Sequence, residues 1–173
     1  CKNCVIGKYQ DEAGQSSCKK CETNKYQDGV GKLSCKYCGA GNEAKTASVS
    51  IITSGATMCT VCNAGQYDDD ELSSTGCKDC QQGQYQPSTG QTSCKKCEIG
   101  KYADETGSVS GCKLCGYGTY QEYEGNKKCY NCGDGRGTLM LGATSSNDCK
   151  DCPAGMYAPF DAYRCEYCPT GKY

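Results

Sequence analysis

The sequence predicts a small disulfide-rich fold, an elongated linear array of about ten short repeats with minimal β-hairpin structure and no helices. All 20 cysteines of the 173-residue chain stand in C-x2-C pairs. Leu, Ile, Val and Phe together supply 15 residues, about 9% of the chain, too few for an ordinary hydrophobic core. Such a chain must be disordered or be held by disulfides or metal, and this density of cysteine favours disulfides in an oxidising compartment. We therefore expect an extracellular protein, either secreted or displayed at a cell surface.

The cysteine pairs define the repeats. Most pairs are followed by a loop of similar length, and no pair departs from the C-x2-C spacing. A short and strict period is typical of linear arrays whose units contact their neighbours. The ten pairs are Cys1/Cys4, Cys18/Cys21, Cys35/Cys38, Cys59/Cys62, Cys77/Cys80, Cys94/Cys97, Cys112/Cys115, Cys129/Cys132, Cys149/Cys152 and Cys165/Cys168.

Glycine and tyrosine hold fixed places within a repeat. The third residue after each pair is glycine in nine repeats and Asn24 in the other, which predicts a tight turn with positive φ. Tyrosine follows two residues later in eight repeats. In several loops a second glycine stands four residues before the next pair. We therefore expect a hairpin-like return with strands of two or three residues, and no segment has helical periodicity.

Repeats three and eight differ from the others in the same way. Both have longer loops, lack the tyrosine and share the motif C-G-x-G. Their separation predicts a higher-order period of five repeats. The first five-repeat unit would cover residues 1–93, with modules starting at 1, 18, 35, 59 and 77, and the second, incomplete unit residues 94–173, with modules starting at 94, 112, 129, 149 and 165. Apolar residues in the two longer loops are candidate assembly contacts: Ile51, Ile52, Leu139, Met140 and Leu141.

The residues leave three arrangements of the cysteines open. A neighbour scheme bonds the second cysteine of one pair to the first of the next and closes loops of about 14 residues. An interlocked scheme joins Cys1 to Cys18 and Cys4 to Cys21. Four-cysteine zinc sites also fit the spacing, although the chain has no histidine. The neighbour scheme, which we favour, pairs Cys4 with Cys18, Cys21 with Cys35, Cys38 with Cys59, Cys62 with Cys77, Cys80 with Cys94, Cys97 with Cys112, Cys115 with Cys129, Cys132 with Cys149 and Cys152 with Cys165, and Cys1 and Cys168 would pair outside residues 1–173.

Composition also bears on chemistry and partners. Without histidine there is no Ser-His or Cys-His arrangement, and no phosphate-binding or dinucleotide motif occurs, so we expect no enzyme, no catalytic residues, no cofactor and no metal. The 19 basic and 20 acidic residues are interspersed, which disfavours nucleic acid as a partner. Residues 1–173 contain no apolar run of membrane-spanning length. No N-x-S/T sequon occurs, which leaves only O-linked glycans open.

The motif C-x2-C-x2-G-x-Y with its returning glycine resembles the ephrin-receptor-like cysteine-rich repeat, a relative of tumour-necrosis-factor-receptor modules. Residues 152–157 (CPAGMY) and 168–173 (CPTGKY) keep the family's frequent proline, whereas the other repeats depart from it. The resemblance implies that each disulfide joins the second cysteine of one pair to the first of the next. Long uninterrupted arrays of this kind look like protist and algal surface proteins, including components of mastigonemes and other extracellular fibrils, and they resemble parasite surface antigens.

Two functions follow as hypotheses. In the first, the chain is a structural protein, a disulfide-stapled rod in a filament, surface coat or flagellar appendage. It would self-assemble into a homopolymer or pack laterally against other surface proteins. In the second, it is a receptor-like or antigenic binding ectodomain at the cell surface. The five-repeat period favours the first, because equal spacing of the longer loops would repeat identical contacts along a fibre.

Overall fold

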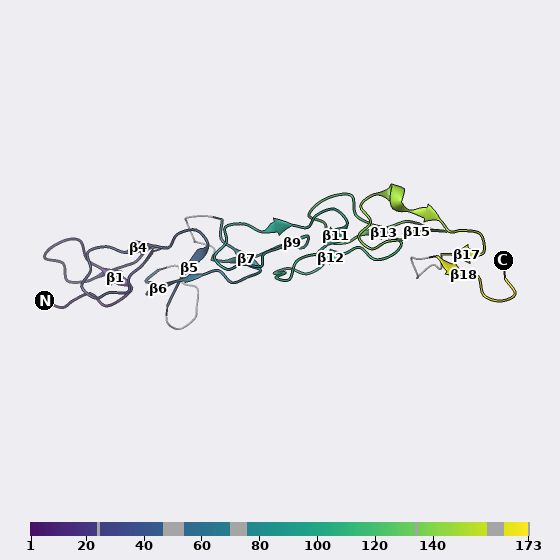
Figure 1. Ribbon diagram of the computed structural model, residues 1–173. Coiled ribbons are helices and arrows are strands. Elements are labelled where there is room, and N and C mark those ends of the chain that lie inside the picture. Colours follow the sequence, from purple (N-terminus) through teal and green to yellow (C-terminus); the bar gives the residue numbers. More distant parts are fainter. Residues whose placement is uncertain (24, 47–53, 70–75, 134, 159–164, 173) are drawn as a thin grey trace. The chain divides into compact units, whose positions relative to one another are not determined.

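The computed structural model describes residues 1–23, 25–46, 54–69, 76–133, 135–158 and 165–172 (Figure 1). In these ranges the regular structure consists of two-stranded antiparallel sheets, one turn of 3₁₀ helix, η1 (Ser146–Asp148), and no α-helix. The hairpins are β1 (Lys8–Tyr9) with β2 (Lys19–Lys20), β3 (Lys25–Tyr26) with β4 (Lys36–Tyr37), β5 (Asn42–Lys45) with β6 (Met58–Val61), β7 (Gln66–Tyr67) with β8 (Lys78–Asp79), β9 (Gln84–Tyr85) with β10 (Lys95–Lys96), β11 (Lys101–Tyr102) with β12 (Lys113–Leu114), β13 (Thr119–Tyr120) with β14 (Tyr130–Asn131), β15 (Arg136–Gly137) with β16 (Lys150–Asp151), and β17 (Met156–Tyr157) with β18 (Glu166–Tyr167).

We number these hairpins as modules 1 to 9 in chain order. The first strand of most modules ends on the tyrosine of the repeat. Its partner is the pair of residues between the two cysteines of the next C-x2-C, as in β1 and β2, where Tyr9 stands opposite Lys19. The predicted disulfide-rich array of minimal hairpins is therefore confirmed. The C-x2-C pair itself provides the return strand.

The turn glycines have the predicted backbone conformation. Their φ angles lie between 71° and 85°, in the left-handed region that favours glycine. Asn24, which takes this place in module 2, lies outside the described residues. The turn glycines are Gly7, Gly41, Gly65, Gly83, Gly100, Gly118, Gly135, Gly155 and Gly171.

Consecutive modules are joined by backbone hydrogen bonds. Between modules 6 and 7, the N–H of Gly100 donates to the carbonyl of Gln121 (2.7 Å), and the N–H of Cys115 donates to the carbonyl of Gly100 (2.9 Å). The N–H of Gly125 donates to the carbonyl of Cys97 (2.8 Å), and that of Ala103 to Asn126 (3.2 Å). The same four bonds join modules 1 and 2 through Gly7, Gln10, Cys21 and Gly31. Because they use only main-chain groups, they tolerate wide variation in the loops.

The turn glycine also meets the loop two modules further on. A Cβ at Gly100 would overlap the carbonyl oxygen of Gly142, and a Cβ at Gly7 would overlap that of Gly55. Gly41 approaches Gly90, and Gly83 approaches Gly125, in the same way. Here a module contacts both its neighbour and the next module but one.

The apolar part of the interior is made of disulfides and small side chains. Among the described residues, the buried apolar side chains are cysteines and alanines, including Ala44, Ala56, Ala103 and Ala143. The larger aliphatic side chains, such as Leu33 and Leu139, are exposed. The low content of Leu, Ile, Val and Phe is thus matched by a core that needs none of them.

By its contacts the chain forms two compact units, one of Cys1–Asp79 with Ser88–Cys94 and the other of Cys80–Pro87 with Lys95–Tyr173. These units follow contacts, whereas the division after residue 93 follows a sequence period, and that period stays a prediction. No helix in the described part of the chain has the length and apolar character needed to cross a membrane.

Candidate functional site

The disulfides close each hairpin at its base. They join Cys4 to Cys18, Cys21 to Cys35, Cys38 to Cys59, Cys62 to Cys77, Cys97 to Cys112, Cys115 to Cys129, Cys132 to Cys149 and Cys152 to Cys165, and Cys80 and Cys94 are also disulfide-bonded. Their Cα atoms lie 5.4–5.8 Å apart, within the usual range for a disulfide. Cys1 and Cys168 are free thiols, and their pairing outside residues 1–173 stays a prediction. Bonded cysteines cannot supply the thiolates of a zinc site.

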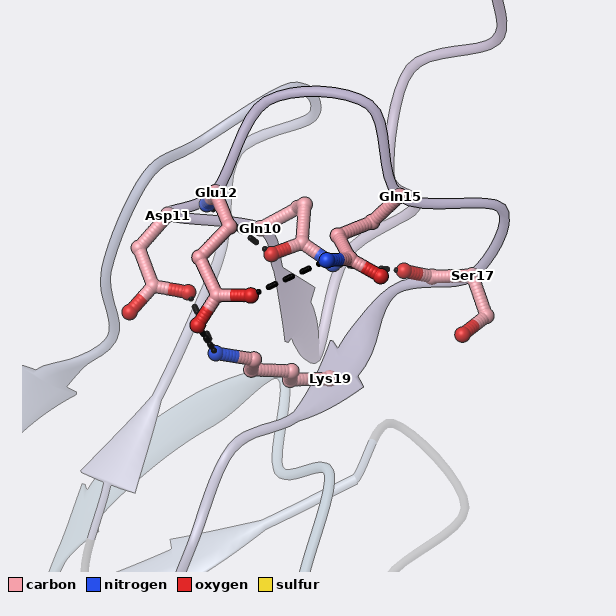
Figure 2. A network of polar contacts seen from close by, with 6 residues as sticks. All are labelled: Gln10, Asp11, Glu12, Gln15, Ser17 and Lys19. Atoms are coloured by element: carbon pink, nitrogen blue, oxygen red, sulfur yellow. Dashed lines mark hydrogen bonds and ion pairs between the residues drawn. The ribbon is translucent and has the colours of Figure 1, made fainter.

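A polar network organises the loop of module 1, and related networks occur in modules 2 and 7. In module 1, Gln10 Nε2 donates to the carbonyl of Ser17 (2.7 Å), and Gln10 Oε1 accepts from the N–H of Glu12 (3.0 Å) (Figure 2). Gln15 Nε2 donates to Glu12 Oε2 (3.1 Å). The side chain of Gln10 thereby fastens both sides of its loop.

Glutamine fills the same position in modules 2 and 7, where it is buried. Gln121 Nε2 donates to the carbonyl of Lys128 (2.7 Å), and its Oε1 accepts from the N–H of Tyr123 (3.0 Å) and from Asn126 Nδ2 (3.1 Å). Gln27 makes the matching bonds to Ser34 and Gly29. Our sequence analysis missed this residue, although glutamine directly follows the tyrosine in four repeats, at Gln10, Gln27, Gln86 and Gln121.

Ion pairs cross the hairpins on their exposed face. Lys19 Nζ lies 2.7 Å from Asp11 Oδ1 and 3.1 Å from Glu12 Oε1 (Figure 2). The hydrogen bond from Lys19 holds the pKa of Asp11 below its ordinary value. The same lysine–aspartate pair occurs in modules 2, 4 and 6, as Lys36–Asp28, Lys78–Asp69 and Lys113–Asp104. These charges neutralise each other within one module.

Modules 3 and 8 share a Gly-Ala-Thr segment that contacts other modules. The alanines Ala56 and Ala143 are buried and form parallel bridges to Tyr26 and Tyr120 of the preceding modules. Residues 42–45, expected within a long loop, instead form strand β5, with Glu43 and Ala44 buried. Part of each longer loop is therefore packed structure. Ile51 and Ile52, predicted as assembly contacts, lie outside the described residues.

Module 8 presents the other predicted contact residues to solvent. Leu139, Met140 and Leu141 are 79%, 59% and 50% exposed. Their exposure follows from Thr138, which is buried, accepts from the N–H of Gly118 (2.7 Å) and donates to the carbonyl of Met140 (3.1 Å). This turn directs three apolar side chains outward. An open groove beside them is lined by Tyr117, Thr138, Leu139, Pro153, Met156 and Tyr167.

The groove beside residues 138–141 and the thiols of Cys1 and Cys168 are candidate adhesive or reactive features of the described residues. In the part of the chain that the structure describes, no group of three or more His, Cys, Asp or Glu side chains could hold a metal ion. The candidate site is a surface, formed by residues 138–141 of module 8 and the groove beside them. We call this surface the module 8 patch.

Comparison with known protein families agrees with the hairpin geometry. The family model described as "Tyrosine-protein kinase ephrin type A/B receptor-like" matches residues 71–111 and again residues 100–149. No curated protein matches the chain significantly. The two matched segments include modules 5 to 7 and much of module 8, and the hairpins outside them share the disulfide-closed architecture. Residues 71–149 thus contain ephrin-receptor-like cysteine-rich repeats, and the described hairpins outside this segment are disulfide-closed modules of the same kind.

Proposed function

We propose that the chain is a structural extracellular protein, a disulfide-stapled array that forms part of a filament, surface coat or flagellar appendage. The observation that carries this proposal is the main-chain stacking of consecutive modules. The four hydrogen bonds between modules 6 and 7 recur between modules 1 and 2, where the side chains differ. When stacking uses main-chain groups, modules with different side chains can follow one another with the same contacts between neighbours. A regular structural array requires this.

Contacts two modules apart support the same role. A hinge between two modules would separate Gly100 from Gly142, or Gly7 from Gly55, in addition to breaking the bonds between neighbours. Bending therefore disturbs two layers of contacts within a unit, which favours a stiff array. Stiffness suits a protein that holds its shape outside the cell more than one that wraps around a ligand.

Assembly with further copies needs an adhesive surface, and we assign that role to the module 8 patch. Leu139, Met140 and Leu141 are exposed apolar side chains in consecutive positions, and such surfaces commonly mark sites of association. The partner we propose is a second copy of the chain or a neighbouring protein of the same coat. Ile51 and Ile52 of module 3 remain candidates for an equivalent contact five modules earlier.

Electron microscopy of the unreduced protein, isolated from its source, tests this proposal. We expect filaments or ordered lateral arrays. A variant with Leu139, Met140 and Leu141 all replaced by serine is expected to stay folded, because exposed substitutions cost little, yet to lose this order. Leu33→Ser is the matched control, since Leu33 is 73% exposed in module 2 and lies far from the patch in sequence.

The opposite outcome favours the second hypothesis. If both the unsubstituted protein and the triple serine variant remain isolated molecules at high concentration, self-assembly is contradicted. This result would favour a receptor-like or antigenic binding ectodomain. The module 8 patch would then be the first surface to examine for a ligand. If filaments or ordered arrays still form in the triple serine variant, the structural function stands, but the module 8 patch does not take part in assembly.

A further inference from the structure

Module 7 differs from five other hairpins at one position of its return strand. In five modules a lysine stands opposite the tyrosine of the first strand, as Lys113 does opposite Tyr102. In module 7 this position is Tyr130, which stands opposite Tyr120 in the pairing of β13 with β14. Two phenols therefore face each other where other modules place an ammonium group beside the ring.

The rings of these two tyrosines are in contact. Their centroids lie 5.9 Å apart with an interplanar angle of 42°, a tilted arrangement within the range of interacting aromatic pairs. Tyr130 is 42% exposed, and Tyr120 is half-buried. The disulfide between Cys115 and Cys129 closes the module directly beside Tyr130, which holds the hairpin in register.

A third tyrosine of module 7, Tyr123, stands in the loop between β13 and β14. Tyr123 is 58% exposed, and its N–H donates to the buried side chain of Gln121 (3.0 Å), so its position in the loop is held. The negative charge of Glu122 raises the pKa of the Tyr123 phenol, and Tyr130 and Tyr120 raise it further.

Neighbouring phenols favour one class of chemistry in an oxidising extracellular setting. A one-electron oxidant removes an electron and a proton from a phenol and leaves a radical whose spin density reaches the ring carbons next to the hydroxyl. Two such radicals combine through these carbons. Holding both rings in contact replaces a bimolecular encounter by an intramolecular one, which raises the rate strongly.

We propose that Tyr120 and Tyr130 form an oxidative cross-linking site, at which hydrogen peroxide and a haem peroxidase join the two rings within one chain. Each phenol gives up one electron and one proton, and a carbon–carbon bond forms between the ring positions next to the hydroxyls. Two ring C–H bonds are broken as the phenols regain their aromatic form. The peroxide takes up both electrons and both protons, and each dityrosine is formed with two molecules of water. The product ties β13 to β14 independently of the disulfide.

The experiment uses residues 1–173 with the disulfides intact and the free thiols alkylated. The protein is treated with hydrogen peroxide and a plant haem peroxidase at low concentration. Dityrosine fluorescence, the mass of the monomer and peptide mapping are then measured. We expect a monomer lighter by two hydrogen atoms, with the peptide containing Tyr120 joined to the peptide containing Tyr130 after reduction of the disulfides.

Variants separate this site from random oxidation. Tyr130→Phe keeps a ring in place but removes the phenol, and Tyr130→Lys installs the residue that other modules use, so both are expected to fold and to lose the monomeric cross-link. Tyr120→Phe is expected to lose it as well, whereas Tyr123→Phe retains it. Tyr37→Phe and Tyr167→Phe are the controls, because these tyrosines are 70% and 79% exposed and lie in other modules.

The proposal is overturned by either of two results. The first is a cross-link that persists in Tyr130→Phe, or that forms chiefly between chains through Tyr37 or Tyr167, since exposure alone would then decide reactivity. The second is a cross-link that is lost in Tyr123→Phe and retained in Tyr120→Phe. Loss of dityrosine in the Tyr130 and Tyr120 variants alone supports the site as described.

Discussion

At the turn after each C-x2-C pair, glycine satisfies two separate requirements. Its φ angle is positive, which costs a residue with a side chain about 1–2 kcal/mol. At Gly100 the space that a Cβ would occupy is also taken by the carbonyl of Gly142, two modules away. At Gly155, which has the same turn, nothing lies within 4 Å of that space. A substitution at Gly155 therefore measures the cost of the positive φ angle alone, whereas one at Gly100 adds the cost of steric overlap.

We expect Gly100→Ala to destabilise its module by about 3 kcal/mol and Gly155→Ala by about 1 kcal/mol, because only the first adds overlap to strain. Hydrogen exchange measures both locally. The reporters are the amides of Cys115 and Cys168, which donate to the carbonyls of Gly100 and Gly155. Equal acceleration of exchange in the two variants would show that the contact with Gly142 contributes nothing.

Gln121 offers a second test at this scale. Its fully buried amide accepts from Tyr123 and Asn126 and donates to Lys128, whereas the equivalent Gln10 is half-buried. We expect Gln121→Ala to cost about 2 kcal/mol, which corresponds to roughly 30-fold faster exchange of the Tyr123 amide. Gln10→Ala is expected to change exchange of the Glu12 amide much less, because water can replace the lost bonds. A larger effect at Gln10 would contradict the role of burial.

At the scale of the hairpin, the recurring lysine–aspartate pair gives a pH dependence with a definite sign. The hydrogen bond from Lys113 holds the pKa of Asp104 below its ordinary value of 3.8. A carboxyl group whose pKa is lower in the folded state stabilises that state above the unfolded pKa. This contribution is lost as the pH falls through the folded pKa. The hairpins should therefore be insensitive to pH between 5 and 7 and weaken below about pH 4.

The variant Lys113→Met tests the cause. We expect the pKa of Asp104 to rise toward 3.8, while that of Asp28 stays low because Lys36 still donates to it. Carboxyl chemical shifts followed by NMR through the acid range report both values. A pKa of Asp104 that does not change in Lys113→Met would mean that the ion pair is absent in solution.

The hairpin also shows what the sequence allows to be predicted. Spacing of cysteine and glycine was sufficient for the module and its turn, because both depend on residue types with few substitutes. The return strand was not located, since dipeptides such as Lys19–Lys20 carry no periodicity and pair only because the disulfide brings them to the first strand. Strand β5 was missed for a related reason, because Asn42–Lys45 has no strand-like alternation and is fixed by β6 and the buried Ala44. The buried glutamines were overlooked because glutamine is usually exposed.

At the scale of the whole molecule, stability comes from repetition of one neighbour contact. Each disulfide closes one hairpin, and similar main-chain bonds recur between neighbouring hairpins, as between modules 1 and 2 and between modules 6 and 7, so the chain needs no large apolar core. The Gly-Ala-Thr segments of modules 3 and 8 stand five modules apart. The segment of module 3 lies against Gly7 in the same way as the segment of module 8 lies against Gly100. This likeness motivates the predicted five-module period, which a longer stretch of the array would test.

Mapping the disulfides of the unreduced protein tests the central claim, that every module is closed by a bond between neighbouring C-x2-C pairs. Trypsin can cut between the two cysteines of several pairs, since Lys19 and Lys36 stand between them. We predict that the peptide with Cys4 is bonded to the peptide with Cys18, and Cys21 to Cys35. Bonds from Cys1 to Cys18 and from Cys4 to Cys21 would instead show interlocked pairs, and the stacked hairpin modules could not form as described.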